Sequence, residues 1–172
     1  MRLEANVVAR VGALWVTVFL FQVSVVPHFR VAGYIIDLPL IVVALVTLHL
    51  NAQSGSLVGF LAGLVMDLVL QTPFGMTALT FSLLGFTAGS VSPHLTQRNA
   101  ITRALVVALL AATATALFAS FGAVIGLEYV TRRELGAIAL VTAVAAVPLA
   151  CVLSPLVRWT LALRFSPITS SR

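Results

Sequence analysis

Long apolar runs separated by short polar segments make up nearly the whole chain. The runs predict six helices, at about residues 11–26, 34–50, 55–70, 75–91, 104–125 and 136–156. A helix needs about 20 apolar residues to cross the hydrocarbon core of a bilayer. A chain of 172 residues therefore has room for about six crossings. We expect an all-α integral membrane protein, with one polytopic domain over residues 1–172 arranged as a compact bundle.

The second run is interrupted near its start by Asp37 and Pro39. If the helix begins after Asp37, this carboxylate caps free backbone N–H groups, and Pro39 falls in the first turn, where its missing N–H does no harm. The remaining helix would be too short to span a bilayer alone. Asp37 could instead pair with Arg30 or approach Asp67 as a protonatable pair. Its role is therefore open between a structural cap and a binding carboxylate.

Small residues recur along the third and fourth runs. In the third, Gly55, Gly59 and Gly63 stand four residues apart. The fourth run has the spacing 4, 3, 4 in Ala78, Ser82, Gly85 and Gly89. Small residues one helical turn apart let two helices approach closely in lipid. We expect these two helices to pack backbone to backbone, and the alternative is that the glycines form a surface for another protein.

Asp67 continues the glycine spacing one step further, inside an apolar run. An ionisable group in such a run is costly unless it is paired or faces a protein interior, so it indicates function by default. The missing side chain at Gly63 leaves space for a partner group to reach the carboxylate. We expect Asp67 to bind a partner. The alternatives are a structural carboxylate that accepts hydrogen bonds from a neighbouring helix or turn, and a proton or cation relay.

Composition and charge agree with a membrane protein. Hydrophobic residues make up 60% of the chain, charged residues only 9%, and all ten basic residues are arginines. The arginines lie at the edges of the apolar runs, so they indicate topology and give no reason to expect nucleic acid as a partner. With the N-terminus inside, the cytoplasmic arginines are Arg2, Arg10, Arg98, Arg103, Arg158, Arg164 and Arg172, against Arg30, Arg132 and Arg133 outside. This asymmetry predicts that both termini are cytoplasmic.

The sequence carries no recognisable catalytic motif. It has no lysine for a phosphate-binding loop, no G-x-S-x-G turn and no H-E-x-x-H pair. The three histidines, His28, His49 and His94, have spacings typical of no metal site. The single cysteine, Cys151, is expected to pack in the core. We therefore expect no enzyme, no cofactor and no bound metal.

The segment from Gly55 to Gly89, GSLVGFLAGLVMDLVLQTPFGMTALTFSLLGFTAG, resembles the core of the rod shape-determining protein MreD family. The residues that match its glycine-and-aspartate helix and the opening of the next helix are Gly55, Gly59, Gly63, Asp67 and Gly75. The family often has Pro followed by Asp or Asn at the start of its second span. Here Asp37 precedes Pro39 instead, so the resemblance assigns no role to Asp37.

This resemblance implies a scaffold in the bacterial inner membrane, part of the cell-elongation machinery. Its implied partners are the single-span protein MreC and, indirectly, MreB filaments and the RodA-type and penicillin-binding-protein wall synthases. The implied fold is similar to the S components of energy-coupling-factor vitamin transporters, which supplies an alternative function, a vitamin-binding transporter subunit. S components dock through a small-residue AxxxA pattern in their first span, and residues 11–26 lack it. The scaffold is therefore the preferred interpretation.

Overall fold

The computed structural model describes residues 5–28, 30–31, 33–69, 73–94, 100–126 and 132–161. This part of the chain is almost entirely helical, as expected. Its α-helices are α1 (Ala5–Ser24), α2 (Leu38–Thr47), α3 (Ala52–Asp67), α4 (Met76–Val91), α5 (Ala100–Val124) and α6 (Arg132–Leu161). Two single 3₁₀ turns, η1 (Val26–His28) and η2 (Ser92–His94), follow α1 and α4.

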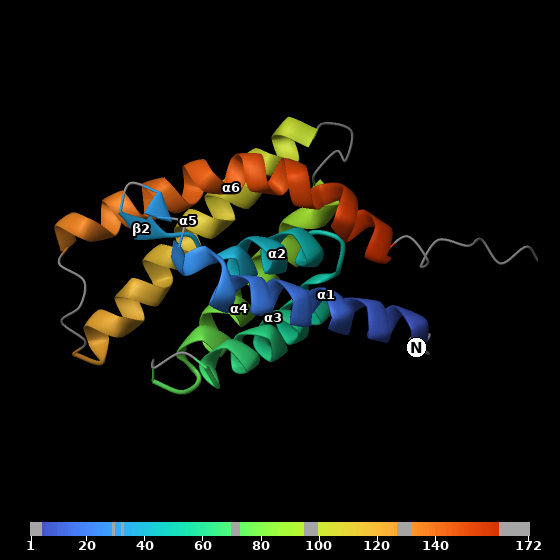
Figure 1. Ribbon diagram of the computed structural model, residues 1–172, viewed down its shortest axis with the longest axis horizontal. Coiled ribbons are helices and arrows are strands. Elements are labelled where there is room, and N and C mark those ends of the chain that lie inside the picture. The colour runs from blue at the N-terminus through green and yellow to red at the C-terminus, as the bar shows by residue number, and fades with distance from the viewer. Residues whose placement is uncertain are drawn as a thin grey trace, which may run out of the picture.

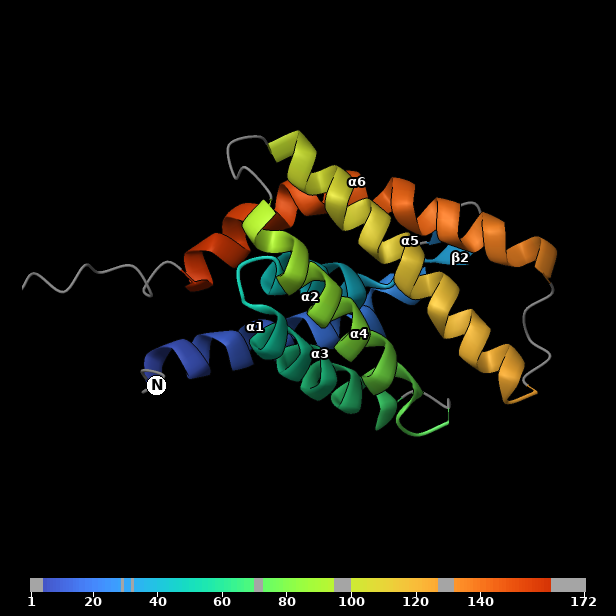
Figure 2. The ribbon, with the colours of Figure 1, turned by 180° about the vertical axis from the view of Figure 1, so that it is seen from behind.

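The short helix α2 is the centre of the molecule. It contacts each of the other five α-helices, and Ile41, Val43 and Leu45 have no exposed surface. A helix that is apolar on all sides is stable only when it is surrounded, and α2 meets this condition. Figures 1 and 2 show the α3–α4 pair and the α5–α6 pair on either side of α2, with α1 packed across it.

The N-terminal end of α2 is held by a cap and by a side chain from α1. Asp37 accepts a hydrogen bond from the backbone N–H of Leu40 at 3.1 Å, and Pro39 lies in the first turn. The Gln22 side chain accepts from the N–H of Leu38 at 3.0 Å and donates to the carbonyl of Ile36 at 3.2 Å. These bonds fix where α2 begins, four residues beyond the start of the apolar run.

A small antiparallel hairpin replaces the polar connection and the early helix expected after residue 28. Its strands are β1 (Arg30–Val31) and β2 (Tyr34–Ile35), paired with Arg30 opposite Ile35. Gly33 has a φ of 88°, a left-handed conformation that glycine adopts without steric cost. This turn allows the chain to reverse within four residues, so the early part of the second run is strand rather than helix.

The helix bounds differ from the sequence expectation mainly at N-terminal ends. The third helix begins at Ala52, with Asn51 as its cap, and the fifth begins at Ala100. The sixth begins at Arg132, four residues before its expected start at 136, and it continues to Leu161. Polar residues can extend a helix that its apolar stripe has already nucleated, so hydropathy underestimates these lengths.

Two helical segments, Ala100–Val124 and Gly136–Leu161, are long and apolar enough to cross a membrane. Shorter apolar segments include Leu38–Thr47 and Met76–Val91. Many large apolar side chains point outward, among them Leu109 and Val152 at 66% and 71% exposure. Such a surface suits lipid, and the expectation of six crossings remains a prediction.

Cys151 lies on this outer surface of α6, so its expected place in the core is wrong. In a membrane protein an apolar side chain need not be buried in protein, because lipid tails solvate it equally well.

Candidate functional site

The backbones of α3 and α4 touch at the glycine positions. A β-carbon built on Gly59 would lie 2.7 Å from the carbonyl carbon of Phe81, and one on Gly63 would lie 2.5 Å from the α-carbon of Ala78. Real β-carbons do not approach backbone atoms this closely. Only glycine therefore permits this separation of the two helices at Gly59 and Gly63.

The contacts are reciprocal along the whole pair. Gly55 and Gly85 face each other, each against the carbonyl of the other, and a β-carbon on Gly89 would lie 2.7 Å from the carbonyl of Asn51. Between the Gly55–Gly85 and Gly59–Phe81 contacts the hydroxyls of Ser56 and Ser82 form a hydrogen bond of 2.8 Å. The glycine face of α3 is thus covered by α4 and is not available to another protein in this conformation.

Asp67 joins the end of α3 to the start of α4. It is 4% exposed, and its carboxylate accepts hydrogen bonds from the backbone N–H groups of Gly75 (2.9 Å), Thr77 (3.1 Å) and Ala78 (3.0 Å). The first N–H groups of a helix lack partners within it, and the positive end of the helix dipole favours a negative charge. Asp67 supplies both the hydrogen-bond acceptors and the negative charge, so its geometry is that of a structural carboxylate.

Gly75 makes this cap possible. It has a φ of 96°, which turns the chain so that its N–H and those of the first helical turn face Asp67. Gly75 itself has no side chain to cap α4, so the capping oxygens come from eight residues earlier. The family resemblance includes Gly75 as the opening of the next helix, and the structure shows that its left-handed turn brings the N–H groups of α4 to Asp67.

The structure brings six of the seven candidate residues together in one α3–α4 interface: Gly55, Gly59, Gly63, Asp67, Gly85 and Gly89. The seventh, Asp37, is separate and caps α2. The structure describes the backbone of Arg30 but not its side chain, so the pairing of Arg30 with Asp37 stays a prediction. A role of these residues in partner binding stays a prediction as well.

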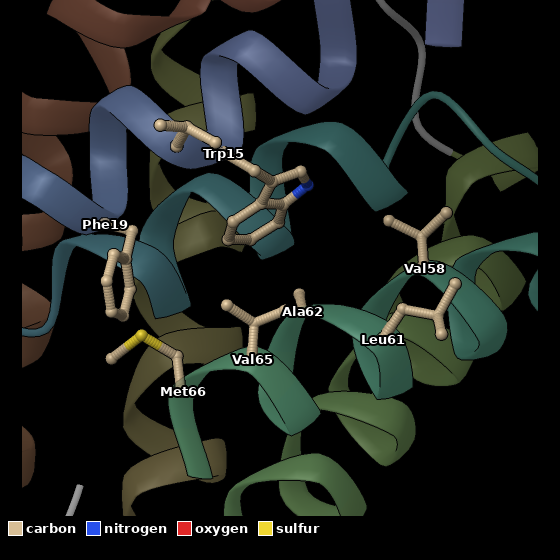
Figure 3. Close-up of a pocket in the computed structure, with 8 residues that line it drawn as sticks. Trp15, Phe19, Val58, Leu61, Ala62, Val65 and Met66 are labelled. Atoms are coloured by element: carbon tan, nitrogen blue, oxygen red, sulfur yellow. The ribbon is translucent and has the colours of Figure 1, made fainter. Parts of the chain in front are cut away.

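Sequence reasoning missed an apolar groove between α1 and α3. The groove has a volume of about 290 Å³ and is lined by Trp15, Val16, Phe19, Val58, Leu61, Ala62, Val65 and Met66. Figure 3 shows the rings of Trp15 and Phe19 on one side, facing the smaller side chains of α3 on the other. The periodic signal for it was present, since Val58, Ala62, Val65 and Met66 fall on one face of a helix.

A second pocket of about 470 Å³ lies between the α3–α4 pair and α5. Its lining is also apolar: Phe60, Pro73, Phe74, Gly75, Met76, Leu79, Phe121, Val124 and Ile125. Neither of these pockets offers a constellation of acids, bases or nucleophiles. Within the described residues, no three His, Cys, Asp or Glu side chains lie close enough together to hold a metal ion.

The fold and this site define a helical membrane protein in which a glycine-packed, aspartate-capped hairpin stands beside a buried central helix. The model of the rod shape-determining protein MreD family matches residues 6–161. This match covers most of the chain, and the protein belongs to the MreD family. No curated protein and no solved structure matches the chain. The expected likeness to S components stays a prediction.

Proposed function

We propose that this protein is a scaffold subunit of the bacterial cell-elongation machinery, which binds an MreC-like single-span protein and thereby supports lateral peptidoglycan synthesis. Its membership of a rod shape-determining family supports this role. In this proposal MreB filaments, RodA-type synthases and penicillin-binding proteins act with it indirectly. The chain crosses the bacterial inner membrane several times, has both termini in the cytoplasm and catalyses no reaction.

The observation that carries the proposal is the apolar outer face of α3 beside the groove. Leu57, Leu61, Val65 and Leu68 are each at least half exposed on the side of α3 away from α4. Their spacing of 4, 4, 3 keeps them on one helical face, as in anchors that receive a partner helix. Because α4 occupies the glycine face, a partner's transmembrane helix would use this outer face and the groove next to it.

The vitamin-carrier alternative has less support. Small-molecule sites combine apolar walls with a few placed polar groups that fix the ligand. Both described pockets are lined by apolar side chains, apart from the indole N–H of Trp15. A polar vitamin would lose its hydrogen bonds to water there without regaining them.

In-cell photocrosslinking from single probe positions tests the proposal. Probes at Leu61 and Val65 line the groove, whereas matched probes at Leu83 and Phe86 occupy exposed positions on α4. We expect an MreC-like protein to be captured from the first pair and not from the second. Capture of an ABC-type coupling subunit would instead favour the carrier. Equal capture of the MreC-like protein from both pairs, or none from either, would count against the groove as its surface.

A further inference from the structure

Arginines gather at the end of the molecule where α1 and α5 begin and α6 ends. The guanidinium carbon of Arg10 lies 5.0 Å from the ring centre of Trp159, and the guanidinium of Arg103 donates to the hydroxyl of Ser154 at 2.5 Å. Ser154 lies one helical turn before Arg158 on α6, so its bond to Arg103 places these two arginines near each other across α5 and α6.

No described carboxylate balances this charge. Among the charged side chains that the structure describes, the carboxylates are Asp37 and Asp67, which cap the starts of α2 and α4. Gln22 of α1 bonds to the start of α2 beside Asp37, whereas Arg10 lies twelve residues earlier on α1, so the arginines and the carboxylates lie at opposite ends of the molecule. Guanidinium groups bind phosphate strongly because their planar N–H donors match its oxygens.

The position of the cluster favours a phosphate that belongs to a lipid. Trp159 is 61% exposed at this end, and exposed tryptophans are typical of the membrane–water interface. On α6 the exposed side chains of Cys151 and Pro155 lie seven and three residues before Arg158, on the same helical face, and flank it with apolar surface. A soluble anion would gain nothing from such flanks, whereas acyl chains would lie along them.

We propose that Arg103 and Arg158 together bind the phosphate of an anionic phospholipid, while Arg10 adds positive charge nearby. Basic pockets between transmembrane helices on the cytoplasmic side bind anionic headgroups in this manner. The site is separate from the α1–α3 groove, and it does not depend on which protein binds there.

Native mass spectrometry of the purified full-length protein tests the site. Phosphatidylglycerol and phosphatidylcholine with the same acyl chains are offered together, and the ratio of the two bound lipids is measured. We expect the wild type to prefer phosphatidylglycerol, and Arg103→Gln or Arg158→Gln each to lower this preference about fivefold. Equal retention of the two lipids by the wild type would overturn the proposal.

Three controls separate binding from folding and from net charge. Arg158 is exposed, so Arg158→Gln tests the site even if Arg103→Gln disturbs packing. Arg103→Lys keeps the charge and should retain most of the preference, whereas a loss as large as in Arg103→Gln would contradict a charge-based site. Arg132→Gln removes the same net charge at the opposite end of α6, and an equal loss in this variant would also overturn the proposal. So would binding of inorganic phosphate without any preference between the two lipids, because it would assign the arginines to a soluble anion.

Discussion

The α-carbon of Gly59 faces the carbonyl group of Phe81 so closely that no side chain fits between α3 and α4 at this point. Helices in lipid gain little from burying apolar surface, so their association depends on close packing. The glycines let the two backbones meet over about two turns, from Gly55 opposite Gly85 to Gly63 opposite Ala78. This pairing gives α2 and α1 a fixed surface to pack against.

Gly59→Ala should destabilise the protein. The new methyl group would have to move the backbone of Phe81, and overpacking of this kind costs about 1–3 kcal/mol. Gly136→Ala is the matched control, because a β-carbon at Gly136 meets open space and alanine favours helix. Thermal unfolding in detergent measures both. If Gly59→Ala unfolds at the temperature of Gly136→Ala, the close approach of α3 and α4 does not limit stability.

Asp67→Ala should also destabilise the protein, because it leaves three backbone N–H groups at the start of α4 without their acceptor. Loss of a cap and of buried hydrogen bonds costs about 1–3 kcal/mol. Asp67→Asn keeps one carbonyl oxygen and should lose less. Ser90→Ala is the control: it removes an exposed hydroxyl that bonds to a carbonyl within α4, so it should change stability little. Unfolding temperature and cellular protein level are the measurements.

The same variant distinguishes the two interpretations of Asp67. A structural carboxylate predicts that rod shape fails in proportion to the loss of folded protein. Misshapen cells with normal amounts of stable Asp67→Ala protein would instead indicate that the carboxylate acts on a partner.

The sequence predicts local features of this fold better than contacts across a turn. The capping geometry of Asp37 follows from its position just before Pro39, and the pairing of α3 with α4 follows from the spacing of their small residues. The partners of Asp67 are eight to eleven residues ahead, and only the left-handed turn at Gly75 brings them back. Apolar periodicity alone cannot show which of two apolar faces meets protein and which meets lipid, so it wrongly assigns Cys151 to the core and misses the groove.

Val65→Trp should block a partner helix without unfolding the protein. Val65 is 50% exposed beside the groove, so an indole can occupy the groove without displacing the core. Binding of an MreC-like protein should fall at least several-fold, as measured by co-purification at equal protein levels. Leu83→Trp makes a comparable change on the exposed face of α4 and should bind normally. Unchanged binding by Val65→Trp would exclude the groove as the contact surface.

Cys151 allows the lipid exposure of α6 to be measured in the otherwise unaltered chain, because it is the only cysteine in the sequence. It is exposed on α6, ten residues before the end of that helix. A charged reagent does not readily enter the hydrocarbon core of a bilayer, so a thiol that faces lipid is out of its reach. In intact membranes a charged maleimide should therefore label Cys151 slowly, and denaturation should accelerate the reaction. Combining Cys151→Ser with Arg164→Cys supplies the positive control: the proposed topology puts residue 164 in the cytoplasm, so this cysteine should react rapidly once that side is accessible. Rapid labelling of Cys151 itself would place this part of α6 against water, and the outer face of α6 would then line an aqueous cavity instead of lipid.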